Sequence, residues 1–269
     1  MTMALRNIKL TISYDGTNYH GWQLQPGKRT IQGELVNAIS NLLGWRTRVT
    51  AASRTDAGVS AVGQVALIQI DSPIPTKNFV KAITDRLPAD IAITEAVEVP
   101  MGFNVIGDAK CKLYRYSIFT GRARPVFVHQ CWHLPEKLDI PLMNEAAKLL
   151  IGQKDFKSFA AADDKRSDSV RTILRCEVYS SCVERDASRE ENTQYARRDT
   201  HDEKDWIYVD VEGDRFLYNM VRNIVGTLVE VGVGRMKPEK ITEIIEAKDR
   251  RAAGPIAPPE GLCLMWIKY

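Results

Sequence analysis

Hydrophobic and polar residues alternate with a period of two at the start of the chain. Every second side chain from Ile8 to Tyr14 is apolar, which is typical of a strand with one buried face. From Ile31 onward the apolar spacing changes to three and four residues. Thr30 can cap a helix there and Gly44 can end it, so the pattern predicts a helix over 31–43.

The first hundred residues continue with four further elements. They are strands over 48–53 and 59–70, a helix from about 76 that stops before Pro88, and a strand over 91–99. The order strand, helix, strand, strand, helix, strand predicts an α+β unit of ferredoxin-like type.

The rest of the chain is predicted to contain the same kinds of secondary-structure element. The expected elements are a strand over 112–119, a helix over 142–151 opened by Pro141 and closed by Gly152, strands over 172–183 and 206–212, helices over about 216–231 and 238–248, and a strand over 262–269. Two α+β domains, 1–108 and 109–269, follow from this order. Between the middle strands, 13 of the 23 residues in 183–205 are charged, which predicts a solvated, mobile hairpin extension.

Composition narrows the class of protein. The 269 residues are 44% apolar and contain no apolar run of eighteen, which argues against a transmembrane span. No secretion-signal pattern precedes the first strand, and the five cysteines form no Cys-x-x-Cys pair, so we expect a cytoplasmic protein with reduced thiols.

The net charge is +3, with +6 in residues 1–135 and −3 in residues 136–269. Because 183–205 accounts for that −3, the remainder is mildly basic, which is compatible with a polyanionic partner.

One turn carries the strongest candidate chemistry. Residues 53–58 (SRTDAG) deliver Asp56 between two strands, with Arg54 two residues earlier and small residues after it. A nearby guanidinium would keep this carboxylate ionised as a nucleophile or base. The simpler interpretation is that Asp and Gly only make the turn, and by pattern alone it is favoured.

Two more segments bear on this choice. Arg222 lies in a largely apolar helix, where a buried guanidinium needs a carboxylate or phosphate partner, and Asp56 is an attractive one. A guanidinium that reaches solvent is the alternative. Tyr114, in the strand segment 112–116 (KLYRY), could stack on a nucleobase or could belong to an ordinary amphipathic strand.

Other features point less clearly to function. His129, Cys131 and His133 share a strand face, but no fourth ligand is near in sequence, so packing is favoured over a metal site. The aromatic-rich loop 14–22 could face RNA or anchor itself by burying its rings. No Walker, Rossmann or H-E-x-x-H motif is present to support ATP, NAD or metalloprotease chemistry.

Taken together and in order, these segments resemble the bacterial tRNA pseudouridine synthase A family. The matching motifs cover nearly the whole chain: YDGT at 14–17 through GWQ at 21–23, TIQG at 30–33, SRTDAGV at 53–59, LYRY at 113–116, VRTI at 170–173, MVRNIVG at 220–226 and GL at 261–262. The combination of the aspartate motif with the later MVRNIVG motif is highly specific.

The resemblance implies a cofactor-free isomerase that converts uridine to pseudouridine at positions 38, 39 and 40 of the tRNA anticodon arm. It implies that Asp56 is catalytic, that Arg54 engages the substrate, that Tyr114 stacks on the target uracil and that Arg222 pairs with the catalytic carboxylate. Leu262 would be an apolar wall of the pocket. It also implies a homodimer in which each protomer has two α+β halves that share a mostly antiparallel sheet around a central basic cleft.

Three positions depart from the family pattern. Ser53 and Ser60 replace a common Gly and a common His, and residues 103–106 (FNVI) stand where Phe-His-Ala-Arg is common, so Ile106 removes a positive charge. Three rival functions are a non-catalytic RNA-binding protein, a related enzyme that modifies other uridines or another RNA, and a hydrolytic N-glycosidase. An ionised Asp56 facing phosphates would not help a pure binder, and a glycosidase generally needs a second carboxylate to direct water.

Overall fold

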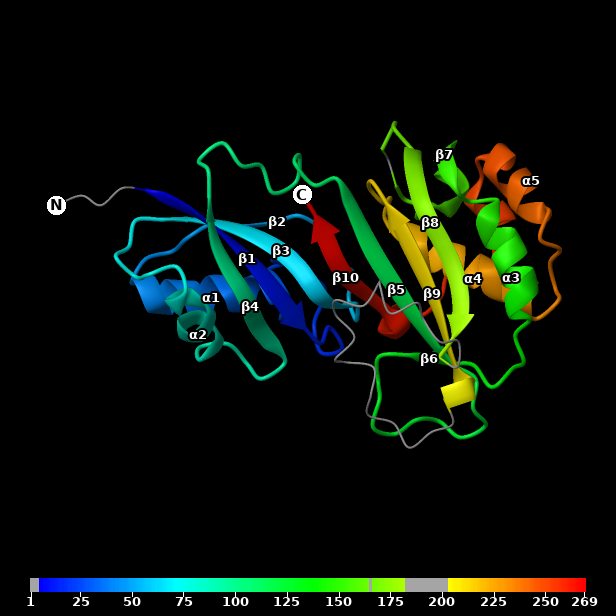
Figure 1. Cartoon of the computed structure of the whole chain (residues 1–269), viewed down its shortest axis with the longest axis horizontal. Helices are drawn as coiled ribbons and strands as arrows, with labels where there is room; N and C mark the ends of the chain where they lie inside the picture. Colours follow the sequence, from blue (N-terminus) through cyan, green and yellow to red (C-terminus); the bar gives the residue numbers. More distant parts are fainter. Residues whose placement is uncertain (1–4, 165, 182–202) are drawn as a thin grey trace. The chain divides into compact units, whose positions relative to one another are not determined.

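A computed structural model describes residues 5–164, 166–181 and 203–269 of the chain (Figure 1). It divides into two compact α+β units: unit 1 is Met1–Tyr114 with Cys263–Tyr269, and unit 2 is Arg115–Leu262. The division into domains at 108/109 stays a prediction, because compactness does not test independent folding. Most of the predicted charged extension, 183–202, lies outside the described residues.

Unit 1 has the predicted ferredoxin-like arrangement. Its elements are β1 (Arg6–Tyr14), α1 (Ile31–Leu43), β2 (Val49–Ala51), β3 (Ser60–Ile70), α2 (Asn78–Thr84) and β4 (Ile91–Val99). The strand order is β4-β1-β3, with β2 also paired to β3, and all these pairs are antiparallel. The late strand β10 (Leu262–Lys268) joins by pairing parallel to β3 at Cys263 and Leu264.

The alternating pattern of β1 predicted the core of unit 1. Ile8, Leu10 and Ile12 are fully buried, and Leu35 of α1 is buried as well. The predicted helix ends are confirmed to the residue. The Thr30 hydroxyl accepts a hydrogen bond from the Gly33 amide at 3.2 Å, and Gly44 ends the helix in the left-handed region at φ +83°.

Unit 2 is also built of strands and helices, in the order two strands, a helix, three strands and two helices. Its elements are the second half of β5 (Cys111–Phe119), β6 (Trp132–His133), α3 (Ile140–Lys148), β7 (Gly152–Asp155), β8 (Val170–Ser180), β9 (Trp206–Gly213), α4 (Met220–Gly232) and α5 (Lys240–Ala247). Short 3₁₀ turns lie at Lys157–Phe159, Glu203–Asp205, Arg250–Ala252 and Pro259–Gly261. The strands follow the order β5-β9-β8-β7, with β6 paired parallel to β5.

Three predicted helix boundaries are wrong by about three residues or more. The helix α2 ends at Thr84 rather than just before Pro88, and successive short turns fill the gap. The helix α3 ends at Lys148, and Gly152 opens β7 at φ +102° instead of closing the helix. The helix α4 begins at Met220, because Asn219 adopts a left-handed conformation at φ +61° that a helix cannot propagate through.

The described part of the chain contains no helix long and apolar enough to cross a membrane. Four of the five cysteines are described, namely Cys111, Cys131, Cys176 and Cys263, and no disulfide joins any two of them. Cys182 lies outside the described residues.

Candidate active site

Residues 53–58 form the turn that carries Asp56, called the Asp56 turn below, and this turn connects β2 to β3 in unit 1. The Val59 amide donates to the Asp56 carbonyl at 3.2 Å, and Gly58 between them has φ +80°, a conformation that favours glycine. Asp56 is half-buried and Arg54 is exposed. The turn therefore holds Asp56 in a partly shielded position between the two strands.

The backbone of this turn is held from the side of β1 and the following loop. The hydroxyls of Thr55 and Tyr14 are hydrogen-bonded at 2.7 Å, and the Trp22 amide donates to the Thr55 carbonyl at 3.0 Å. A Cβ on Gly21 would lie 2.7 Å from that same carbonyl oxygen, so only glycine fits there without displacement. The family motif containing Gly21 and Trp22 is thus a support for the turn.

Gln64 of β3 holds the Ser53 end of the turn. This residue was not identified from the sequence as part of the site. Its side chain is fully buried. Its Nε2 donates to the Ser53 carbonyl at 2.8 Å and to the Tyr14 hydroxyl at 3.4 Å. A glutamine within the apolar pattern of a strand was the only sequence feature that could have indicated this role, since buried amides need hydrogen-bond partners.

The aromatic residues of the loop 14–22 pack inward. Tyr14, Tyr19 and Trp22 expose 4%, 3% and 1% of their surface. Of the two interpretations that the sequence left open, the self-anchoring loop is therefore confirmed.

Tyr114 of β5 lies beside the turn in unit 1. Its hydroxyl is hydrogen-bonded to the Ser53 hydroxyl at 2.9 Å. Burial, with a smaller contribution from the negative charge of Asp56, raises the pKa of Tyr114 to about 12, so its phenol is neutral at physiological pH. The fold therefore brings Tyr114 and Asp56 into electrostatic contact, which the sequence could not show.

Two cationic side chains near the Asp56 turn in sequence or in space, Arg54 and Lys112, have different surroundings. Arg54 is exposed and forms no ion pair with any described residue, so it does not act on Asp56 as a salt-bridge partner. Lys112, two residues before Tyr114, is buried, and its Nζ donates to the Ala52 carbonyl at 2.8 Å. Lys112 thereby fixes the strand that leads into the turn.

Arg222 belongs to unit 2. It is half-buried on α4, its Nε donates to the Ala257 carbonyl at 2.8 Å, and its guanidinium also reaches the Asn219 side chain at 3.2 Å. The pairing with Asp56 stays a prediction. The neighbouring polar residues of α4 have structural contacts: Asn223 donates to the Phe159 carbonyl at 2.8 Å, and Gly226 packs directly against the Pro255 carbonyl.

The departures from the family pattern are accommodated locally. The buried Ser60 hydroxyl accepts a hydrogen bond from the Gly16 amide at 3.0 Å. Asn104 closes its own turn by accepting from the amides of Ile106 and Gly107 at 3.1 and 3.0 Å. Ile106 is 58% exposed, so the side chain at this position faces solvent.

No cluster of three or more His, Cys, Asp or Glu side chains suited to a metal occurs among the residues the structure describes. His133 bonds to the Gly121 carbonyl at 2.9 Å through its Nε2, and the Cys131 thiol lies 3.7 Å from the Val128 carbonyl. Backbone contacts therefore account for these two side chains.

The Ser53–Tyr114 contact gives a first prediction. Ser53→Ala and Tyr114→Phe each remove one hydroxyl of the pair, and we expect each to lower the free energy of unfolding by about 1 kcal/mol. Because both changes break the same bond, the double variant should be less destabilised than the sum of the two, with a coupling of at least about 0.5 kcal/mol. Urea denaturation of the four proteins measures this coupling, and strict additivity would contradict it.

Comparisons with known proteins match this chain along nearly its whole length. A family profile described as tRNA pseudouridine synthase matches residues 10–106 and 146–269. The tRNA pseudouridine synthase A of Caldicellulosiruptor saccharolyticus is 40% identical over 266 residues, which cover 98% of this chain and 100% of that protein. The protein of the same name from Acetivibrio thermocellus is 41% identical over 266 residues, with the same coverage of both chains.

Among solved structures, a Cbf5-Nop10-Gar1 complex has a TM-score of 0.31 and 12% identity over 82% of this chain and 54% of that one, a likeness too weak to bear on the fold. The sequence matches are far stronger, since they combine about 40% identity with full coverage. They agree with the resemblance found in the sequence motifs. The chain belongs to the tRNA pseudouridine synthase family.

Proposed function

We propose that this protein isomerises uridine to pseudouridine at positions 38, 39 and 40 of tRNA, with Asp56 as its catalytic residue. Membership of the family supports the reaction and the tRNA substrate. The observation that carries the assignment of Asp56 is its position: a half-buried carboxylate on a turn held by Tyr14, Trp22 and Gln64.

The reaction rearranges one nucleotide without adding or removing an atom overall. The bond from C1′ of the ribose to N1 of uracil breaks, and a bond from C1′ to C5 forms. The proton lost from C5 is balanced by one gained at N1. Attack on the sugar, attack on the base and removal of a proton all need an ionised carboxylate at the reacting nucleotide, and each route remains open to Asp56.

The target uridine must leave its stack to reach this carboxylate. Extrusion of a nucleotide costs a few kcal/mol of stacking and pairing, which an aromatic side chain can partly replace. Tyr114, neutral and hydrogen-bonded to Ser53 beside Asp56, is the residue we assign to stacking on the uracil. Exposed Arg54 is assigned to substrate binding because its guanidinium is free of ion pairs within the described residues. Arg222 is assigned to substrate binding on the family resemblance alone.

Two further features of the proposal also rest only on the resemblance. One is the homodimer, which light scattering of the purified protein would test. The other is the absence of a cofactor, which would be tested by the activity of protein dialysed against a chelator. We further propose a cytoplasmic location, where an enzyme of this family would meet its tRNA.

Product analysis distinguishes the proposed function from its rivals. We expect the wild-type protein to convert uridine to pseudouridine in an unmodified tRNA transcript and to release no free uracil, as measured by chromatography of the digested nucleosides. Free uracil with no pseudouridine would identify a hydrolytic N-glycosidase. Tight tRNA binding with neither product would identify a non-catalytic binder, and either result would overturn the proposal.

A further inference from the structure

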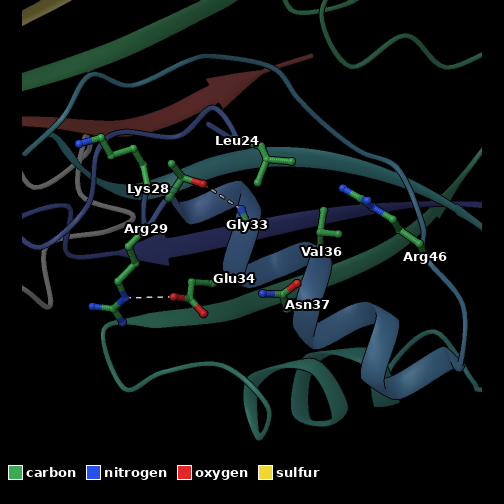
Figure 2. Close-up of a pocket in the computed structure, with 9 residues that line it drawn as sticks. Leu24, Lys28, Arg29, Gly33, Glu34, Val36, Asn37 and Arg46 are labelled. Atoms are coloured by element: carbon green, nitrogen blue, oxygen red, sulfur yellow. Dashed lines mark hydrogen bonds and ion pairs between the residues drawn. The ribbon is translucent and has the colours of Figure 1, made fainter. Parts of the chain in front are cut away.

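An open pocket of about 270 Å³ lies over the first turns of α1 in unit 1 (Figure 2). Leu24 and Val36 supply apolar side chains to its lining, and Lys28 and Arg46 lie at opposite sides of it. Leu24, Lys28 and Arg46 are all exposed. The volume is below the roughly 300 Å³ at which enclosed small-molecule pockets begin, so the site suits part of a larger ligand that passes over the surface.

The charge of this pocket is strongly positive. Its lining has three cations, Lys28, Arg29 and Arg46, and one acid, Glu34. Glu34 pairs with Arg29 at 3.0 Å, on the side of the pocket away from Arg46 (Figure 2). Within the described part of the chain, neither Lys28 nor Arg46 forms an ion pair. Two cations therefore remain available to an external anion.

A tight turn positions Lys28. The Lys28 amide donates to the Gln25 carbonyl at 3.2 Å, Pro26 follows Gln25, and Gly27 has φ +68°. Proline in the second position of a four-residue turn and a left-handed glycine in the third are typical of a type II turn. The lysine is thus held at the pocket edge by local geometry, although its side chain extends into solvent.

The pocket and the Asp56 turn share one loop. Trp22 donates to the Thr55 carbonyl at 3.0 Å and, through its own carbonyl, accepts from the Gln32 amide of α1 at 3.0 Å. The same loop then supplies Leu24 and Lys28 to the pocket. Directly before Arg46, Trp45 exposes 46% of its surface, so aromatic surface adjoins the cations. The pocket is therefore joined through one loop to the turn that carries Asp56.

We propose that this pocket binds a backbone phosphate of the RNA substrate, between Lys28 and Arg46, with the adjoining ribose against Leu24 and Val36. The identity of the RNA as tRNA rests on the proposed function. The contact is a site outside the reacting nucleotide, and it contributes affinity without reading sequence, as phosphate contacts do. The first three amides of α1 take no part in it, because they already donate hydrogen bonds to Gly21, Trp22 and Thr30.

Removing the two cations tests this site. We expect the double variant Lys28→Gln/Arg46→Gln to bind a tRNA transcript about tenfold more weakly near 0.1 M salt. The slope of log affinity against log salt concentration should fall in magnitude by about 1, as for one lost phosphate contact. The transcript carries cytidine at positions 38–40, so that binding is measured without turnover. A failure of the proposed reaction would therefore leave this result interpretable.

Two control variants distinguish a contribution of this pocket to RNA binding from an effect of net charge. Lys77→Gln/Arg86→Gln also removes two exposed cations from unit 1, at α2, and should bind within about twofold of wild type. Lys28→Arg/Arg46→Lys keeps both charges and should retain most of the affinity. Unchanged affinity and salt slope in the Gln variant, with an unchanged melting temperature, would overturn the proposal. An equal loss in the α2 control would also overturn it, since the effect would then be one of net charge.

Discussion

Replacing Asp56 with alanine should lower pseudouridine formation by at least about 1,000-fold, a barrier increase of about 4 kcal/mol. Affinity for unmodified tRNA should stay within about threefold, because removing an anion does not weaken contacts to phosphates. The hydrogen bonds that hold the turn through Ser53, Thr55 and the backbone carbonyl of Asp56 do not involve the removed carboxylate, so we expect these bonds to survive the change. Single-turnover assays and equilibrium binding measure the two quantities separately.

Asp56→Asn is the matched control, because it keeps the size of the side chain and removes only its charge. It should be nearly as inactive as Asp56→Ala, since each proposed route needs an ionised oxygen. Substantial turnover in either variant, or a loss of affinity as large as the loss of rate, would remove Asp56 from the catalytic role.

The second large effect concerns the stability of unit 2. Arg115 of β5 donates two hydrogen bonds to Asp210 of β9, at 2.8 and 2.9 Å, and the side chain of Asp210 is only 3% exposed. Burial lowers the pKa of Arg115, but the bonds to Asp210 outweigh it and the net shift is upward. Asp210→Ala would leave a largely buried guanidinium without its main partner. We expect the free energy of unfolding to fall by about 3–5 kcal/mol.

Denaturant titration of the intact chain checks this value. Arg115→Met/Asp210→Leu removes both charges and should recover much of the loss, because two apolar side chains leave no buried charge unpaired. Asp85→Ala is the exposed comparison: it removes the partner of Lys81 at the surface and should leave the unfolding midpoint nearly unchanged. A similar midpoint for Asp210→Ala and Asp85→Ala would contradict the predicted effect.

The sequence predicted those parts of the fold that depend on local patterns. The β1 alternation and the ends of α1 were correct because Thr30 and Gly44 act within one turn of the helix they bound. The end of α3 was wrong because a glycine after a helical pattern is compatible both with a helix end and with the left-handed start of a strand, as at Gly152. Asn219 shortened α4 in the same way, through a backbone conformation that its identity alone does not specify.

The candidate site was only partly accessible from sequence. The turn holding Asp56 and the strand holding Tyr114 could each be recognised from motifs. Their proximity depends on residues far apart in the chain: Ser53 bonds to Tyr114, and Lys112 bonds to Ala52. Gln64 was missed because its function is to satisfy buried polar groups of other segments, which leaves no local pattern.

The most direct test of the central claim is to map pseudouridine in an unmodified tRNA transcript incubated with wild type or with Asp56→Ala. Carbodiimide labelling followed by mass spectrometry gives the modified positions. We predict label at positions 38–40 with the wild-type protein and no label with the variant. Label elsewhere in the tRNA, or label at 38–40 that persists in Asp56→Ala, would contradict the proposed site or its catalytic carboxylate.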